Sequence, residues 1–233
     1  MAAENQIEVL GQLTNYKVAG SGKKLVILHG WGGSSDSWEK VMEILKNDFE
    51  IFVPDIPGFG KSLSPPKPWK LEDFAFWFKE FVEKLKIKPF FLLGHSFGGR
   101  VAIKFLTLFP QGVEKLILCS AAGIKPKPTF KKRVIFFLAL AGNAIFSKKP
   151  FRRFHDKIRN LFYRFLRNSD WPKTKGTMKE TLKNVLSEDL SPELDKINIK
   201  TLILWGEKDN IVPLKYGKIF AKKIKSATLK VLP

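Results

Sequence analysis

Short apolar runs alternate with amphipathic helical stretches, and this alternation constrains the fold of the chain more than any other feature. It is typical of a mostly parallel sheet whose strands are joined by crossover helices. We expect buried strands at residues 24–29, 50–54, 89–94, 114–120, 200–205 and 227–232. We expect helices at residues 36–46, 71–85, 97–109 and 214–224. The first twenty residues have the pattern of an antiparallel hairpin at a sheet edge, so the predicted fold class is α/β.

Residues 124–193 interrupt the alternation because they contain no convincing strand. Within them, a helical pattern is found at residues 130–144, 152–166 and 177–186. The segment has 17 basic and 6 acidic side chains, so it holds +11 of the net charge of +19. We predict a first core part at residues 1–123, a helical lid at 124–193 and a second core part at 194–233.

The segment Gly94-His95-Ser96-Phe97-Gly98 follows one predicted strand and opens the next predicted helix. Gly-x-Ser-x-Gly in this setting is typical of a nucleophile elbow, a sharp turn that exposes a serine hydroxyl at a helix N-terminus. Gly94 and Gly98 remove side chains that would clash in such a turn. We interpret Ser96 as a nucleophile; the alternative is a glycine-rich turn without chemistry.

A second glycine-rich segment, residues 29–33 (HGWGG), follows the strand predicted at 24–29. The backbone N–H of Trp31 could point to the same place as the N–H of Phe97. Two such donors form an oxyanion hole, which stabilises the negative charge that develops on a reacting carbonyl. His29 and Gly30 would then be structural residues of the loop. The alternative is a flexible loop without a catalytic role.

Two aspartates also follow predicted strands. Asp55 begins the segment DIPGFGKS, and we expect it to organise the hydrogen bonds of a turn near the pocket. Asp209 lies in the segment GEKDNIVP, after the strand predicted at residues 200–205. An aspartate at that place could orient a histidine and stabilise its cation. The alternative is that Asp209 only shapes a turn.

These four segments, in this order and at these strand ends, resemble the α/β-hydrolase fold superfamily over about residues 7–233. They are most similar to its small-ester and carbon–carbon-bond hydrolases with a helical lid. The resemblance implies Ser96 as nucleophile, Asp209 as acid, and the N–H groups of Trp31 and Phe97 as oxyanion hole. It implies no metal or organic cofactor. Members that open epoxides or remove halides carry aspartate at the nucleophile position, so Ser96 argues against both activities.

The catalytic histidine of that family follows the last strand, in a short loop that opens with proline and ends in Gly-His. The printed chain ends at Pro233, where such a loop and a final helix would begin. Of its three histidines, we expect His29 to fix its loop, His95 to point away from Ser96 and His155 to be a polar lid residue. We therefore expect the base to be missing, as in a truncated copy or a gene fragment.

Together these observations predict a serine hydrolase that forms an acyl-enzyme with small-molecule carboxylic esters or related acyl substrates. We expect its activity to be impaired in this chain by the missing base. Two alternatives stay open: a non-catalytic binding protein of the same fold, and a peripheral hydrolase of lipid surfaces. Neither the acyl group nor the oligomeric state follows from the sequence.

The charge of +19 comes from 41 basic and 22 acidic side chains, and it could attract nucleic acid, anionic lipid or acidic substrates. Most lysines fall on polar helix positions, which favours a solubilising surface, and the sequence lacks a nucleic-acid-binding signature. We therefore expect no nucleic-acid partner.

Two features of the lid bear on membranes. The apolar run at residues 134–146 has 13 residues, fewer than the roughly 20 that a membrane span needs. The basic and aromatic stripe at residues 151–167 is expected to close over the pocket, and the alternative is weak docking on anionic lipid. With a single cysteine, Cys119, and no recognisable signal peptide, we expect a cytoplasmic protein, or a membrane-peripheral one as the alternative.

Overall fold

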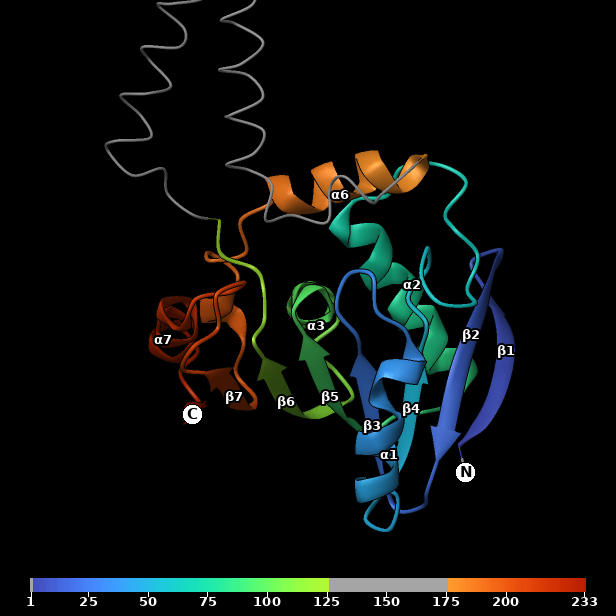
Figure 1. The fold of residues 1–233 in the computed structure, drawn as a ribbon, viewed down its shortest axis with the longest axis horizontal. Coiled ribbons are helices and arrows are strands. Elements are labelled where there is room, and N and C mark those ends of the chain that lie inside the picture. Colours follow the sequence, from blue (N-terminus) through green and yellow to red (C-terminus); the bar gives the residue numbers. More distant parts are fainter. Residues whose placement is uncertain (1, 126–175) are drawn as a thin grey trace, which may run out of the picture. The chain divides into compact units, whose positions relative to one another are not determined.

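The computed structural model describes residues 2–125 and 176–233, which contain one eight-stranded sheet in the order β1-β2-β4-β3-β5-β6-β7-β8 (Figure 1). The strands are β1 (Ala3–Val9), β2 (Gln12–Ala19), β3 (Lys23–Leu28), β4 (Phe49–Pro54), β5 (Phe90–His95), β6 (Val113–Cys119), β7 (Lys200–Gly206) and β8 (Ala227–Leu232). The α-helices are α1 (Glu39–Leu45), α2 (Leu71–Lys84), α3 (Phe97–Leu108), α6 (Thr177–Ser187) and α7 (Leu214–Lys223). Two short 3-10 helices, η1 (Ser35–Trp38) and η4 (Leu194–Lys196), complete the described elements.

The first two strands form the predicted hairpin at the sheet edge. β1 pairs with β2 in antiparallel register, and β2 continues antiparallel to β4. Leu10 and Gly11, which join the two strands, both have positive φ, at 50° and 71°. Positive φ at both central residues is the conformation of a turn whose twist matches the flanking strands. All pairs from β4 to β8 are parallel, so the predicted α/β fold class is confirmed.

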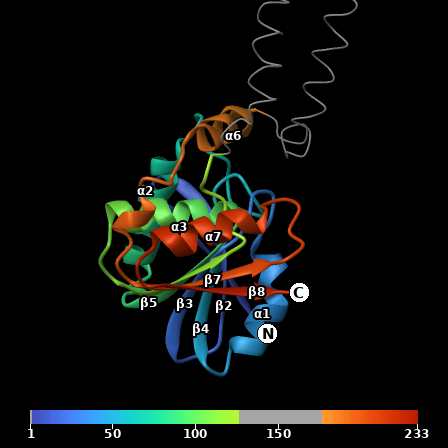
Figure 2. The ribbon, with the colours of Figure 1, turned by 90° about the vertical axis from the view of Figure 1, so that its left-hand side faces the viewer.

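Helices cover the sheet unequally on its two faces. α2, α3 and α7 lie on one face, whereas α1 lies on the other (Figure 2). The larger core cluster joins the sheet to α2, α3 and α7, and the smaller one joins α1 to β3, β4 and β5. The strand β5 contributes to both clusters, through Leu92 on one side and Phe91 on the other. Residues at the C-terminal end of β5 are thus placed by packing on both faces.

The α2 helix shows how its sequence dictates its packing. Its apolar side chains recur every three or four residues and therefore share one face. Phe74, Phe78 and Phe81 on that face are fully buried, as predicted. Phe78 meets Phe105 of α3 edge to ring, with centroids 4.8 Å apart. Aromatic pairs of this geometry add to the free energy gained from burial alone.

One predicted helix, at residues 36–46, has a different start. Residues Ser35–Trp38 form a 3-10 turn, and only Glu39–Leu45 is α-helical. The N–H of Ser35 donates to Oδ1 of Asp55 at 2.6 Å, so the first turn is anchored to the loop after β4. That long-range bond fixes the entry of the chain and leaves a tighter first turn than periodicity indicates.

The described end of the predicted lid packs with the core. The helix predicted at residues 177–186 is α6, and Met178, Leu182 and Val185 are buried. Residues 176–233 belong to the same compact unit as residues 2–125. The helices predicted at residues 130–144 and 152–166 lie outside the described residues. The division of the chain at residues 123 and 193 stays a prediction.

Candidate active site

Ser96 lies at the C-terminal end of β5, in the sharp turn that leads into α3. Its φ of 49° and ψ of −110° place it outside the conformations that serine ordinarily adopts. Neighbouring backbone holds this geometry: Ser96 N donates to Cys119 O at 3.1 Å, and Ala122 N donates to Ser96 O at 3.0 Å. The hydroxyl makes no capping bond to α3. A strained residue in a turn whose backbone is held by hydrogen bonds is typical of a functional position.

Glycines make the turn sterically feasible. A Cβ built on Gly98 would lie 2.1 Å from the carbonyl oxygen of Leu28 in β3. A Cβ on Gly94 would lie 2.7 Å from Gly98 O, and one on Gly99 would lie 2.5 Å from the Cβ of Ala121. A side chain at Gly94, Gly98 or Gly99 would therefore clash with neighbouring atoms in this turn. The start of α3 is packed directly on the backbone of β3.

The glycine-rich loop after β3 lies against the elbow. A Cβ on Gly30 would lie 3.4 Å from the Cβ of Ser96 and 3.0 Å from Nδ1 of His95. The carbonyl of Gly30 accepts from Gly33 N at 3.0 Å, which closes the loop into a tight turn. Gly98 N also donates to His29 O at 3.0 Å, so the loop and α3 are joined directly.

His29 is held in the loop after β3 by contacts at both of its ring nitrogens. It is fully buried, and its Nε2 accepts from Ile56 N at 2.9 Å while its Nδ1 lies 2.7 Å from Gly30 O. Since Nε2 accepts, Nδ1 carries the proton and donates to Gly30. Burial lowers the pKa of His29, only partly opposed by the Gly30 carbonyl and the charge of Asp55. Both ring nitrogens are occupied, so His29 has no free atom for acid–base chemistry.

The two proposed oxyanion donors belong to residues in mutual contact. The rings of Trp31 and Phe97 meet edge to ring with centroids 5.0 Å apart, and Phe59 meets Trp31 at 4.8 Å. Among the hydrogen bonds of the described residues, none uses the backbone N–H of Trp31 or of Phe97. The structure thus brings both residues beside Ser96 with their N–H groups uncommitted to protein acceptors.

Asp55 organises the loop that follows β4. It is buried, and besides Ser35 N its carboxylate accepts from Lys61 N at 2.9 Å and from Nδ2 of Asn15 at 3.0 Å. Its carbonyl accepts from the hydroxyl of Ser62, which in turn accepts from Asn15 N. These partners lie in β2, in the 3-10 turn η1 and in the loop after β4. Asp55 thus joins three segments that are distant in the sequence, and its role as a structural residue stays a prediction.

Asp209 lies in the loop after β7, near the ends of β5 and β6. Its Oδ1 accepts from Ile211 N at 2.9 Å and from Val212 N at 2.8 Å, so this oxygen shapes the loop. Its charge nevertheless influences the pKa of side chains at the ends of β5 and β6. Burial lowers the pKa of His95 and the carboxylate of Asp209 opposes that shift; burial and the same carboxylate both raise the pKa of Cys119.

No histidine among residues 2–125 and 176–233 donates to or accepts from the hydroxyl of Ser96. His95 is half-buried, and its ring lies over Gly30 and meets Trp38 edge to ring at 6.0 Å. His155 lies outside the described residues, as do the apolar run at 134–146 and the basic stripe at 151–167. Among the described residues, no base is therefore hydrogen-bonded to the hydroxyl of Ser96.

Sequence reasoning missed the polar residues that support the site. Asn15 and Ser62 hold Asp55, although they are 40 and 7 residues from it in sequence. Arg100, one turn after Ser96, donates at 2.5 Å to both Val185 O and Glu188 O at the end of α6. Burial lowers the pKa of Arg100 to about 10. The sequence signal for Arg100 was a basic residue on an otherwise apolar face of the helix predicted at residues 97–109.

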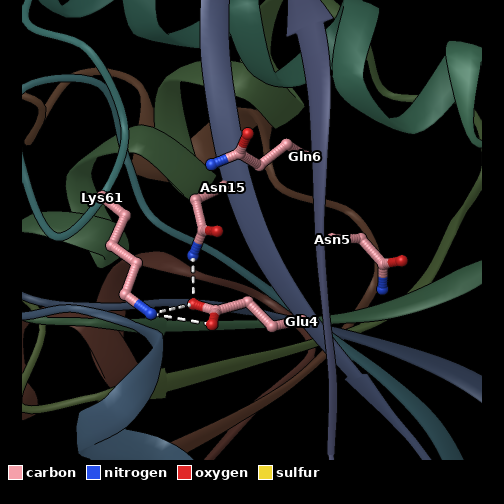
Figure 3. Close-up of a pocket in the computed structure, with 5 residues that line it drawn as sticks. All are labelled: Glu4, Asn5, Gln6, Asn15 and Lys61. Carbon is pink, nitrogen blue, oxygen red and sulfur yellow. Dashed lines mark hydrogen bonds and ion pairs between the residues drawn. The ribbon is translucent and has the colours of Figure 1, made fainter.

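A surface hollow of about 440 Å³ lies beside the hairpin and is lined by Glu4, Asn5, Gln6, Asn15 and Lys61 (Figure 3). Lys61 and Asn15 converge on the carboxylate of Glu4, at 2.7 Å and 3.1 Å, whereas Asn5 points away from them. These groups neutralise one another and include no nucleophile. We therefore place the candidate site at Ser96 and not in this hollow.

Two further properties of the described part of the chain are plain. Within residues 2–125 and 176–233, no three His, Cys, Asp or Glu side chains are grouped so that they could hold a metal ion. None of the described helices is both long enough and apolar enough to cross a membrane.

The chain belongs to the α/β hydrolase fold family, which its residues 23–233 match. It is 29% identical over 226 residues to the pimeloyl-(acyl-carrier protein) methyl ester esterase of Wigglesworthia glossinidia brevipalpis, covering 89% of this chain and 83% of that protein. The esterase EaEST from Exiguobacterium antarcticum superimposes with a TM-score of 0.75 at 24% identity, covering 99% of this chain and 91% of that one, which shows a shared fold. An uncharacterized protein of Mycobacterium tuberculosis is 34% identical over 131 residues, which are 56% of this chain and 37% of that protein, so the chain spans little more than a third of that relative.

Proposed function

We propose that this protein is a serine hydrolase of small-molecule carboxylic esters or related acyl compounds, with Ser96 as its nucleophile. The observation that carries the proposal is the strained turn at Ser96, whose glycines allow β5, α3 and the loop after β3 to meet. A relative named as a methyl ester esterase and an esterase of the same fold support the substrate class. Neither identifies the acyl group, because one fold hosts many substrates.

The reaction follows from the groups at the elbow. The Ser96 oxygen attacks the substrate carbonyl carbon, and the carbonyl oxygen becomes an oxyanion that accepts from the N–H groups of Trp31 and Phe97. The intermediate collapses, the alcohol leaves with a proton, and the acyl group stays on Ser96 as an ester. Water then attacks this ester, and the acid and free serine are released. Asp209 would stabilise a cationic base during the two proton transfers.

This chemistry requires that the proton of the Ser96 hydroxyl be removed. A serine hydroxyl is a poor nucleophile unless an adjacent base removes its proton. His29 has both nitrogens engaged, and His95 lies over Gly30. No histidine of the described residues can therefore remove this proton, and we propose that esterase activity is impaired unless a base outside residues 2–125 and 176–233 reaches Ser96.

Labelling with an activated fluorophosphonate tests the proposal most directly. It is done on the 233-residue chain and on a version extended by a loop that ends in Gly-His. The extended version is expected to label and to hydrolyse a p-nitrophenyl ester, and Ser96→Ala is expected to lower that rate by several powers of ten. Ser120→Ala, directly after the adjacent strand β6, is the matched control and should keep this rate. Near-normal turnover by the Ser96→Ala variant would exclude Ser96.

A non-catalytic binding protein is the second candidate, favoured by the lack of a described histidine on Ser96. It predicts that neither version labels, while an ester still binds to both. Labelling of the 233-residue chain that disappears in His95→Ala or His155→Ala would instead show that one of these histidines is the base.

A further inference from the structure

Arg100 is a buried cation in the helix that follows the elbow. It lies in α3, one turn after Ser96, and is only 5% exposed. Within residues 2–125 and 176–233, its Nε has no hydrogen-bond partner and no ion pair includes its guanidinium. Burying a charge costs free energy unless hydrogen bonds compensate for the lost water. The role of Arg100 therefore lies in the two hydrogen bonds that it does make.

Both of these bonds go to the C-terminal end of α6. Nη2 of Arg100 donates at 2.5 Å to the carbonyl of Val185, in the last turn, and at 2.5 Å to that of Glu188, the C-cap residue. The last carbonyls of a helix have no partner within the helix, and positive charge is favourable beside them. α6 has no basic residue in its own last turn. Arg100 thus supplies from α3 the cap that the sequence of α6 lacks.

α6 in turn holds residues 55–70, which we call the β4–α2 segment. Thr177 Oγ1 donates to the carbonyl of Pro65 at 3.1 Å. One turn later, Thr181 Oγ1 accepts from Trp69 N at 3.0 Å. Nδ2 of Asn184 then donates to the carbonyl of Trp69 at 3.2 Å. Three hydrogen bonds therefore fasten α6 to the chain that leads into α2, beside which α6 lies (Figure 1).

A further contact of α6 reaches Gly58, the residue before Phe59. A Cβ built on Gly58 would lie 2.4 Å from Cε and 2.5 Å from Sδ of Met178, so the Met178 side chain lies directly on this backbone. Met178 is buried there, and Gly58 N donates to the carbonyl of Leu63 at 3.0 Å, which closes the turn. The position of α6 therefore determines the position of the turn that carries Phe59.

Aromatic rings connect the β4–α2 segment with the two proposed oxyanion donors. The ring of Phe59 meets that of Trp31 with centroids 4.8 Å apart. The ring of Trp69 meets Phe74 at 4.9 Å, and Phe74 meets Phe97 at 5.2 Å. Close-packed side chains transmit a displacement because there is no void between them to absorb it. A shift of α6 should therefore move Trp31.

We propose that Arg100 is a positioning residue of the candidate active site. By capping α6, Arg100 holds the β4–α2 segment in place. Through Phe59, that segment holds the loop after β3, which presents the N–H of Trp31 beside Ser96. The effect of Arg100 on catalysis rests on the proposed function, whereas its effect on the position of Trp31 does not.

Amide NMR spectra and hydrogen exchange of the 233-residue chain test the structural part. Arg100→Met keeps a long side chain but removes both donors. The amides of α6 are expected to exchange at least about tenfold faster, because the lost hydrogen bonds have a charged donor. The amide resonances of Trp31 and Phe59 should shift, although neither residue touches Arg100. Arg100→Lys keeps a charged donor and should reverse part of both changes.

Lys104→Met is the matched control. Nζ of Lys104, one turn further along α3, lies 2.6 Å from Glu188 and 2.7 Å from Glu193, so this variant also weakens the contact of α3 with the chain after α6. Among the described residues, however, Lys104 donates to no backbone carbonyl of α6. It should leave the resonances of Trp31 and Phe59 in place, even where it lowers the melting temperature.

Kinetics of the version extended by a Gly-His loop test the catalytic part. A displaced oxyanion donor weakens the binding of the transition state but not of the substrate. Arg100→Met is therefore expected to lower kcat for a p-nitrophenyl ester by roughly tenfold to hundredfold, with KM unchanged within about twofold. Arg100→Lys should recover part of the loss. An inactive extended version would contradict the proposed function alone, because the NMR measurements need no activity.

Three outcomes would overturn the role of Arg100. The first is unchanged exchange of the α6 amides in Arg100→Met. The second is faster exchange of α6 while the resonances of Trp31 and Phe59 stay in place, since Arg100 would then stabilise α6 without positioning the site. The third is a raised KM with an unchanged kcat. If Arg100→Met does not fold, Thr181→Val, which removes the acceptor of Trp69 N, must shift the same two resonances, and unshifted resonances would again overturn the role.

Discussion

The elbow after β5 and the loop after β7 carry the two ends of the proposed site, and they are held by different means. The elbow is fixed by backbone bonds to β6 and to the loop after β3, and by α3, whose first residues are buried. The loop after β7 is exposed, with Ile211 86% exposed. Its order comes from the bonds that Asp209 accepts and from Trp205, whose Nε1 donates to Val212 O at 2.7 Å.

The difference shows that the two parts of one site need different kinds of structural support. A nucleophile must be held in a strained conformation, and only close packing of backbone on backbone provides that constraint. An acid needs only to present a charge, so one carboxylate with two local hydrogen bonds is sufficient. The elbow should therefore be intolerant of added atoms, whereas the loop after β7 should respond to changes in charge.

The largest effect is expected for Gly98→Ala. The new Cβ would lie 2.1 Å from Leu28 O and 2.7 Å from His29 O, and neither backbone can move without distorting β3. We expect a loss of about 3 kcal/mol or more in the free energy of unfolding, measured by urea denaturation. Gly32→Ala is the matched control, because its φ is 76° but nothing lies within 4 Å of the new Cβ. It should cost about 1 kcal/mol, and equal losses would show that packing does not hold the elbow.

A smaller effect on the free energy of unfolding is expected from pH, through His29, the buried histidine in the loop beside the elbow. The folded pKa of His29 is lowered by burial from its ordinary value of 6.5. Below pH 6.5 the unfolded chain takes up a proton that folded His29 excludes, so the unfolding free energy decreases as pH falls. The slope is up to about 1.4 kcal/mol per pH unit for each such group.

Urea denaturation between pH 7.5 and 5.0 measures this slope, above the range where most carboxylates titrate. His29→Gln should be less stable throughout but should flatten the dependence. His95→Gln is the comparison, because His95 is half-buried and burial lowers its pKa while the carboxylate of Asp209 opposes the shift. A wild-type stability that stays constant down to pH 5 would contradict the buried, neutral state of His29.

Most of the fold could be predicted because it depends on local patterns. Each predicted strand is present with ends within one residue or so, since runs such as FFLLGH are apolar on both faces. The elbow was predictable for a related reason: its glycines, serine and flanking elements are contiguous in sequence. The same holds for the hairpin, whose two strands are joined by a two-residue turn.

The supporting polar contacts could not be predicted because they join distant segments. Asn15 meets Asp55 across 40 residues, and Arg100 meets Glu188 across 88. Such pairs depend on strand order and helix placement, which no local pattern specifies. The 3-10 turn at Ser35–Trp38 was missed for this reason, since Asp55 anchors it. The roles of Ser96 and Asp209 in catalysis stay predictions.

The smallest effect is expected for Asp209→Asn, which tests whether the loop after β7 responds to a change in charge. Asparagine keeps an Oδ1 that can accept from Ile211 N and Val212 N, so the loop should stay folded. The lost carboxylate, however, no longer favours the charged form of His95. The pKa of His95, followed by NMR titration of its ring protons, should therefore fall further below 6.5. Glu207→Gln, in the same loop, should leave it unchanged. An unaltered pKa of His95 in Asp209→Asn would mean that the carboxylate does not face the end of β5, and Asp209 could then not serve as the acid of a site at Ser96.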